Sequence, residues 1–132
     1  MATETTVENR PRLDPRPQVD AERVIGSSCQ RCDFRRAAAL DRCPECAGRC
    51  VRTEFGPGAT VFAATVLRVP VPGREPPYAL AYIDLDDGPR ILAHVDDTTE
   101  ALAPGRRVLV SGTTSQGDPL VTPDPIAEEA SS

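Results

Sequence analysis

The sequence predicts an all-β protein built from two small modules, in which a metal-bound ribbon precedes a five-stranded barrel. Three observations lead to this fold class. Two Cys-x-x-Cys pairs lie ten residues apart in the first half of the chain. From residue 59 onward, short runs rich in aliphatic residues follow one another, separated by Gly, Pro and Asp. The stretch Phe55-Gly56-Pro57-Gly58 divides the two parts, because Gly and Pro together end regular structure.

The cysteine pairs predict a structural zinc site. Cys29 and Cys32 form the first pair, and Cys43 and Cys46 form the second. Two residues between the cysteines of a pair turn the chain back, so four thiolates can surround one tetrahedral Zn²⁺ ion at about 2.3 Å. The alternative is a set of free or redox-active thiols. Cys50 follows Cys46 by four residues, and we interpret it as a packed thiol or a strand residue leaving the site.

Four segments are expected along the chain. Residues 1–22 should form a flexible tail, because they mix charges with prolines and show little apolar periodicity. Residues 23–55 should form the zinc ribbon, residues 56–123 the barrel, and residues 124–132 an acidic tail. Both tails are expected to be disordered. Because only 4% of the residues are aromatic, the ribbon should need its metal to fold.

Five short strands account for the barrel segment. They are expected at residues 59–69, 78–86, 90–95, 106–112 and 120–122, with one helical turn at 98–103. Asp87-Gly88 should form a tight turn in which Gly88 accepts a positive φ. Five strands with a helical turn after the third match the OB-fold, a small, partly open Greek-key barrel. The predicted barrel interior consists of Val61, Ala63, Ile83, Leu85, Ile91, Val108 and Val110.

Charge is divided unevenly along the chain, whose net charge is −5. Residues 1–58 carry ten arginines and nine acidic residues, whereas residues 59–132 carry five arginines and eleven acidic residues. Because nucleic-acid affinity rests on cationic contacts to phosphate, the acidic barrel half argues against such a ligand. No apolar run follows Met1 or approaches membrane-spanning length, so we expect a cytoplasmic protein whose thiols stay reduced.

The sequence offers no recognisable catalytic motif. His94 is the only histidine and falls in an expected strand, where a lone histidine is usually structural. Asp84, Asp86 and Asp87 lie at a turn, a position that favours Asp for backbone reasons. A zinc ion with four thiolate ligands has no open position for a catalytic water. We therefore expect no catalytic residues and no intrinsic enzymatic activity.

Taken in order, these motifs resemble the acyl-CoA-associated OB-fold proteins that carry a rubredoxin-like zinc ribbon at the N-terminus. The resemblance extends over residues 24–123. Its most specific parts are the ribbon, the sequence AYIDLDDGPR at 81–90 and the sequence APGRRV at 103–108. It implies a non-catalytic accessory subunit that binds and stabilises a CoA-thioester enzyme, either thiolase-like, a retro-aldolase or a hot-dog hydratase. Such a subunit helps to shape the CoA or acyl channel of its partner.

Arginines that project from the ribbon are candidates for contact with such a partner or with the phosphates of CoA, namely Arg35, Arg36 and Arg42. The alternative for them is a solvated face without a ligand.

Two other functions remain open. An OB-fold next to a zinc ribbon also suits a nucleic-acid-binding module, although the barrel half offers few aromatic residues for stacking, namely Phe62, Tyr78 and Tyr82. A four-cysteine site also suits a rubredoxin-type electron carrier with iron in place of zinc.

Overall fold

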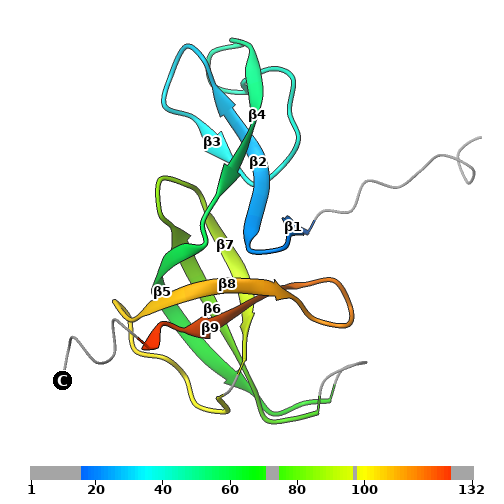
Figure 1. The fold of residues 1–132 in the computed structure, drawn as a ribbon, viewed down its shortest axis with the longest axis vertical. Coiled ribbons are helices and arrows are strands. Elements are labelled where there is room, and N and C mark those ends of the chain that lie inside the picture. The colour runs from blue at the N-terminus through cyan, green and yellow to red at the C-terminus, as the bar shows by residue number, and fades with distance from the viewer. Residues whose placement is uncertain (1–15, 71–74, 97, 126–132) are drawn as a thin grey trace, which may run out of the picture.

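The computed structural model describes residues 16–70, 75–96 and 98–125. These residues form nine β-strands in two bodies, a four-stranded sheet and a closed barrel. Figure 1 shows the sheet at one end of the barrel, with strand β4 (Cys50–Phe55) leading from one body into the other. Within the described residues, no helix is long and apolar enough to cross a membrane.

The small sheet is organised around β2 (Arg23–Cys29), and all of its pairings are antiparallel. β4 pairs with β2 from Val24 to Cys29. The other edge of β2 therefore takes the two short strands β1 (Gln18–Asp20) and β3 (Arg35–Arg36). β1 lies within the expected N-terminal tail, so residues 18–20 of that tail are ordered. Most of the expected tails, at 1–15 and 126–132, fall outside the described residues.

The barrel contains the five strands that the sequence predicted. They are β5 (Gly58–Leu67), β6 (Tyr78–Leu85), β7 (Arg90–Val95), β8 (Arg107–Thr113) and β9 (Pro119–Pro123). Their order around the barrel is β5-β6-β7-β9-β8, and β8 closes the ring on β5. Only β7 and β9 pair in parallel. The prediction of an all-β OB-fold barrel is thus confirmed.

The helical turn expected at residues 98–103 is wrong, because the structure shows no helix there. The Glu100 amide donates to the Thr98 hydroxyl at 3.1 Å, a side-chain bond that competes with helical backbone bonds. Pro104 disfavours helical geometry at the residue before it. Leu102 instead packs against the barrel core from this loop.

The turn between β6 and β7 differs from the prediction in its backbone geometry. The positive φ belongs to Asp87, at 56°, whereas Gly88 does not adopt one. Gly88 is required for space instead, because a Cβ there would lie 2.8 and 2.9 Å from two ring carbons of Phe55. The Gly88 amide closes the turn by donating to the Leu85 carbonyl at 3.0 Å.

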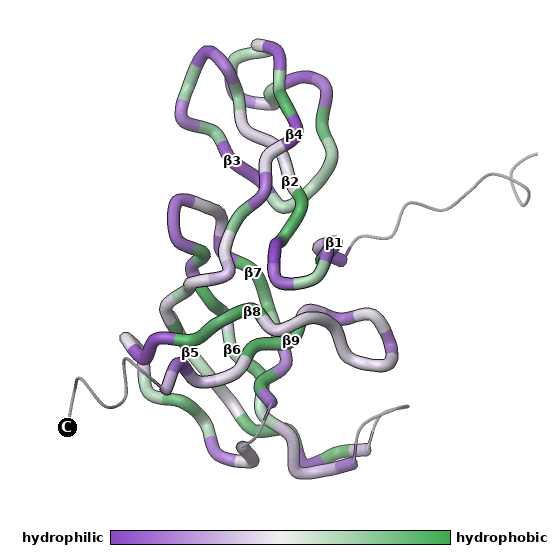
Figure 2. Tube along the Cα trace, viewed as in Figure 1, coloured by the Kyte–Doolittle hydropathy of each residue, from purple (hydrophilic) through white to green (hydrophobic). Residues whose placement is uncertain are grey.

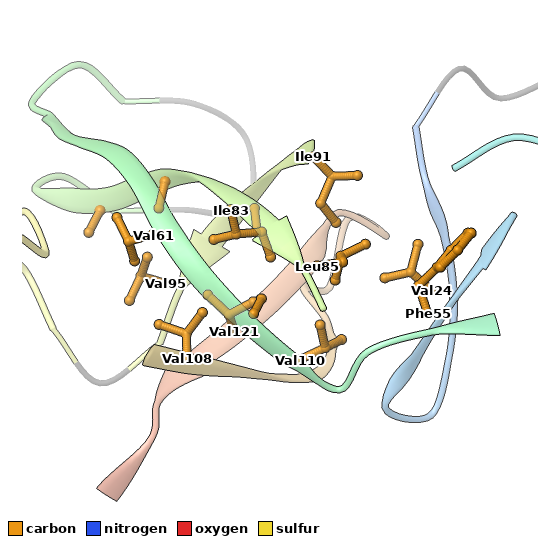
Figure 3. Packing of buried hydrophobic residues seen from close by; sticks show 14 residues of the cluster. Val24, Phe55, Val61, Ile83, Leu85, Ile91, Val95, Val108, Val110 and Val121 are labelled. Carbon is orange, nitrogen blue, oxygen red and sulfur yellow. The ribbon is translucent and has the colours of Figure 1, made fainter. Parts of the chain in front are cut away.

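Aliphatic side chains fill the barrel (Figure 3). Six of the seven predicted interior residues are buried, namely Val61, Ile83, Leu85, Ile91, Val108 and Val110. The exception is Ala63. A β-bulge between Val61 and Ala63 breaks the two-residue alternation, so Ala63 lines a groove on the outside of the barrel. Figure 2 shows the hydrophobic stretches along β7, β8 and β9, in contrast to the hydrophilic β3.

The two bodies share one hydrophobic core. Val24 of β2 and Phe55 of β4 are 0% and 3% exposed and belong to the same buried cluster as the barrel residues. Figure 3 shows both side chains beside Leu85. A polar contact adds to this junction, since the Arg35 guanidinium donates to the Asp87 carbonyl at 2.9 Å. The ribbon is therefore packed against the barrel and is not joined to it by a flexible linker alone.

An ion pair links the turn after β6 to β8 beside this junction. The Arg107 guanidinium contacts the Asp86 carboxylate at 2.6 and 2.7 Å and holds the pKa of Asp86 below its usual range. The pair lies over Gly58, where a Cβ would be 2.4 Å from the carboxylate oxygen. Glycine at this position therefore leaves room for the ion pair.

We predict that Phe55→Ala weakens both bodies together. Removing a buried phenylalanine typically costs about 3 kcal/mol or more of the free energy of unfolding. Urea denaturation of the full chain should show this loss. Val51→Ala on the same strand is the control, because Val51 is 39% exposed and should change stability by less than about 0.5 kcal/mol. Equal, small effects of the two substitutions would contradict a shared core.

Candidate metal centre

The structure brings the four predicted cysteines together. The sulfur atoms of Cys29, Cys32, Cys43 and Cys46 all lie within 4.8 Å of one another. The Sγ of Cys29 is 3.5 Å from that of Cys46, and the Sγ of Cys32 is 3.6 Å from those of Cys43 and Cys46. A tetrahedral ion with metal–sulfur bonds of about 2.3 Å has sulfur–sulfur edges of about 3.8 Å. The cluster therefore has the size of a four-thiolate metal site.

Backbone amides point at the sulfur atoms. The Arg31 amide donates to the Cys29 sulfur at 3.3 Å, and the Glu45 amide donates to the Cys43 sulfur at 3.4 Å. In both cases the amide lies two residues after the cysteine. The amides two residues after Cys32 and Cys46 act on those sulfurs in the same way. Such bonds favour the thiolate, which is the form that binds metal.

The second cysteine pair is held by a compact turn. The Cys43 amide donates to the Gly48 carbonyl at 2.8 Å, and the Ala47 amide donates to the Cys43 carbonyl at 2.8 Å. Ala47 takes a left-handed φ of 62° to make this turn. A Cβ at Gly48 would lie 2.7 Å from Cδ of Arg31, so the stem of Arg31 packs on this glycine. The two cysteine pairs are thereby packed against each other.

Ser27 fixes the ten-residue loop between the pairs. Its side chain is 1% exposed, donates to the Ala38 carbonyl at 2.7 Å and accepts from the Leu40 amide at 2.9 Å. Sequence reasoning missed this role. The only signal was a polar residue at an inward-facing position of a strand, and such a position is visible only once the register of β2 is known.

Three of the clustered thiols, Cys29, Cys32 and Cys46, differ in pKa when no cation is present. The Arg31 amide lowers the pKa of Cys29 to about 6 against the opposing effect of burial. The Phe34 amide also lowers the pKa of Cys32, but burial and the neighbouring sulfurs outweigh it and raise this pKa to about 12. The pKa of Cys46 is raised because the nearby Cys29 sulfur and burial outweigh a favourable amide bond. A cation is therefore needed to hold all four as thiolates near neutral pH.

Cys50 lies beside the cluster and outside it. It is 8% exposed and pairs with Cys29 across β2 and β4. Burial is the main cause that raises its pKa, and the charges of Cys29 and Cys43 add to it. This position at the start of β4 agrees with the interpretation of Cys50 as a packed strand residue.

The three candidate arginines do not converge on one site. Arg35 and Arg36 form β3, whereas Arg42 lies in a β-bridge with Arg49. All three are exposed, and the guanidinium of Arg35 is already bonded to Asp87 at the junction. The nearby hollow between ribbon and barrel measures about 270 Å³ and is lined by Arg23 and Arg35 together with acidic residues. The mixed charges of this hollow do not favour a phosphate.

His94 takes part in a polar cluster at the β8–β9 hairpin. Its Nε2 lies 3.5 Å from the Asp118 carboxylate, and its ring stacks on Tyr78 with centroids 5.8 Å apart. Asp118 also pairs with Arg16 at 3.3 Å. The histidine thus takes part in attaching the segment before β1 to the barrel.

Comparison with known proteins identifies the barrel. The family model described as the C-terminal OB-fold domain of ChsH2 matches residues 52–113, from β4 to the end of β8. The barrel is therefore similar to that OB-fold domain. A chain of the solved structure described as "Ltp2-ChsH2(DUF35) aldolase" superposes with a TM-score of 0.64 at 20% sequence identity. The match covers 82% of this chain and 98% of that chain, so the likeness in fold extends beyond the barrel into the ribbon. No curated protein matches the chain.

We predict that the four clustered cysteines, and not Cys50, bind a divalent metal. Titration of the reduced, metal-free chain with Co²⁺ should produce the absorption of a tetrahedral thiolate complex at one ion per chain. At pH 7 binding should release protons from Cys32 and Cys46, because their pKa values lie above neutral, and affinity should fall as pH falls.

The matched variants are Cys43→Ser and Cys50→Ser. The first should lose the thiolate spectrum, and the second should keep it. Loss of the spectrum in Cys50→Ser alone would contradict the ligand set.

Proposed function

We propose that this chain is a non-catalytic accessory subunit of an enzyme that acts on CoA thioesters. The observation that carries the proposal is the likeness in fold, over nearly all of the matched chain, to a structure whose description names an aldolase. The motif resemblance given by the ribbon and by residues 81–90 and 103–108 supports the same role. On this proposal the catalytic partner is thiolase-like, a retro-aldolase or a hot-dog hydratase.

Zinc is the metal we assign to the four-cysteine site. Four thiolates without an open position suit a structural Zn²⁺ ion, whose binding energy becomes folding energy for a small module. Iron is the competing metal, since it accepts the same four sulfurs. A metal-bound ribbon that shares a core with the barrel is a rigid arm, and we infer that arm and barrel together clamp the partner.

We predict that the tagged full chain, purified from its source cells at low salt, recovers the catalytic subunit. Mass spectrometry of the eluate should identify a thiolase-like, aldolase or hydratase protein, and metal analysis should give about one zinc per chain. Cys43→Ser should lower this recovery at least tenfold, whereas Cys50→Ser should leave it unchanged. Recovery of nucleic acid instead would favour the nucleic-acid-binding alternative, and a red, iron-loaded chain would favour the electron carrier.

Exposed arginines of the ribbon are proposed to contact the partner or the CoA phosphates. Arg36 and Arg42 are the better candidates, because Arg35 already donates to Asp87. We predict that Arg36→Gln with Arg42→Gln weakens CoA binding by the purified complex about tenfold in calorimetry, since a charge-assisted bond contributes about 1.5 kcal/mol or more. Arg68→Gln, at an exposed position of the barrel part, is the control. Unchanged CoA affinity in the double variant would remove these residues from the phosphate site.

A further inference from the structure

The outer face of β5, β6 and β7 carries large apolar side chains in solvent. Phe62 and Tyr82 are each 50% exposed and Leu92 is 45% exposed. These are three of the five large hydrophobic side chains that are exposed in the described part of the chain. Outward positions of a small barrel are normally polar, and a group of exposed apolar side chains marks an interaction site.

Strand register gathers these side chains into one patch, which we call the outer face. Tyr82 on β6 pairs with Leu92 on β7 and with Ala63 on β5. Phe62 lies at the β-bulge between Val61 and Ala63, where the break in alternation accompanies its exposure. The same bulge that places Ala63 outside the core therefore also contributes Phe62 to the outer face.

A groove of about 330 Å³ runs across the outer face. Its lining includes Ala63, Ala64, Thr65, Leu80, Tyr82 and Leu92. The small alanines leave room beside the larger side chains, and all of the lining residues but Thr65 are alanine, leucine or tyrosine. Within the described residues, no charged side chain lines this groove. An aliphatic or aromatic side chain from another molecule fits such a surface.

The charges next to the outer face neutralise each other. The Arg90 guanidinium contacts the Asp84 carboxylate at 2.6 and 3.2 Å. The same guanidinium lies over the Phe62 ring, 3.4 Å from its centroid. A ligand that docks here therefore meets an ion pair without net charge. An uncharged protein surface complements this arrangement, whereas a phosphate backbone would require additional cations.

We propose that the outer face is the surface on which the barrel docks the catalytic subunit, through an uncharged apolar segment whose side chain enters the groove. This inference rests on the proposed function. β6 and β7 are the second and third strands of the barrel, and this face is the one on which OB-folds commonly bind their ligands. Core regions of protein interfaces are rich in aromatic residues and poor in charge, as this face is.

The test measures binding of the catalytic subunit recovered in the purification above, expressed alone and titrated by calorimetry into the zinc-loaded full chain. Leu92→Ser should weaken binding at least tenfold, and Tyr82→Ser should do the same. Val69→Ser is the matched control, because Val69 is 61% exposed and lies outside the groove lining. It should bind within twofold of the wild type. Thermal melting and zinc content should be equal in all the variants.

The other outcomes separate this inference from the proposed function. If both face variants bind the recovered catalytic subunit like the wild type, the outer face is not the docking surface, whereas the proposed accessory role is unaffected. If no catalytic subunit is recovered, both fall. Sedimentation of the wild type as a dimer that Leu92→Ser converts to a monomer would assign the face to a second copy of the chain. Binding of a thymidine oligonucleotide that Tyr82→Ser abolishes would assign it to nucleic acid. Either result overturns the proposal.

Discussion

The geometry of the ribbon depends on bringing four cysteine sulfurs within 4.8 Å of one another. Amide groups favour a thiolate at Cys29, yet burial and the neighbouring sulfurs raise the pKa of Cys32 to about 12. Four negative charges at this spacing repel one another unless a cation lies between them. The surrounding hydrogen bonds of Ser27 and of the turn at Ala47 hold the loops in the geometry that such an ion requires. If the cluster holds such an ion, as proposed, metal binding and folding of the ribbon are one process.

The junction extends this dependence to the barrel. Phe55 and Val24 belong to ribbon strands but lie in the barrel core, and Gly88 has no side chain so that the Phe55 ring can approach. The ribbon consequently has a defined orientation on the barrel. A rigid two-part surface of this kind loses little conformational entropy on binding, which favours a role in holding another subunit in place. The outer face of β5, β6 and β7 supplies an apolar contact that the ribbon, with its arginines, does not.

Sequence patterns that act locally were sufficient to predict much of this structure. Cysteine spacing identified the cluster because a Cys-x-x-Cys turn is a local structure, and aliphatic runs identified the five strands because burial alternates along a strand. Features that depend on tertiary contact were not predictable. The bulge that turns Ala63 outward is a feature of the pairing between β5 and β6. The space that Gly88 provides is needed by a phenylalanine 33 positions earlier. β1 likewise follows from pairing with β2, and the packing of Leu102 on the barrel core depends on distant residues. The outer face could not be predicted without the strand register, because Phe62, Tyr82 and Leu92 are far apart in the sequence.

The most direct test of the account is X-ray absorption at the zinc edge of the protein purified from its source cells. A single four-thiolate centre predicts a shell of four sulfur atoms at about 2.3 Å, with about one zinc per chain. A shell containing oxygen or nitrogen ligands, or a protein that folds and melts identically without zinc, would contradict the claim that one tetrahedral ion holds Cys29, Cys32, Cys43 and Cys46 and through them the ribbon.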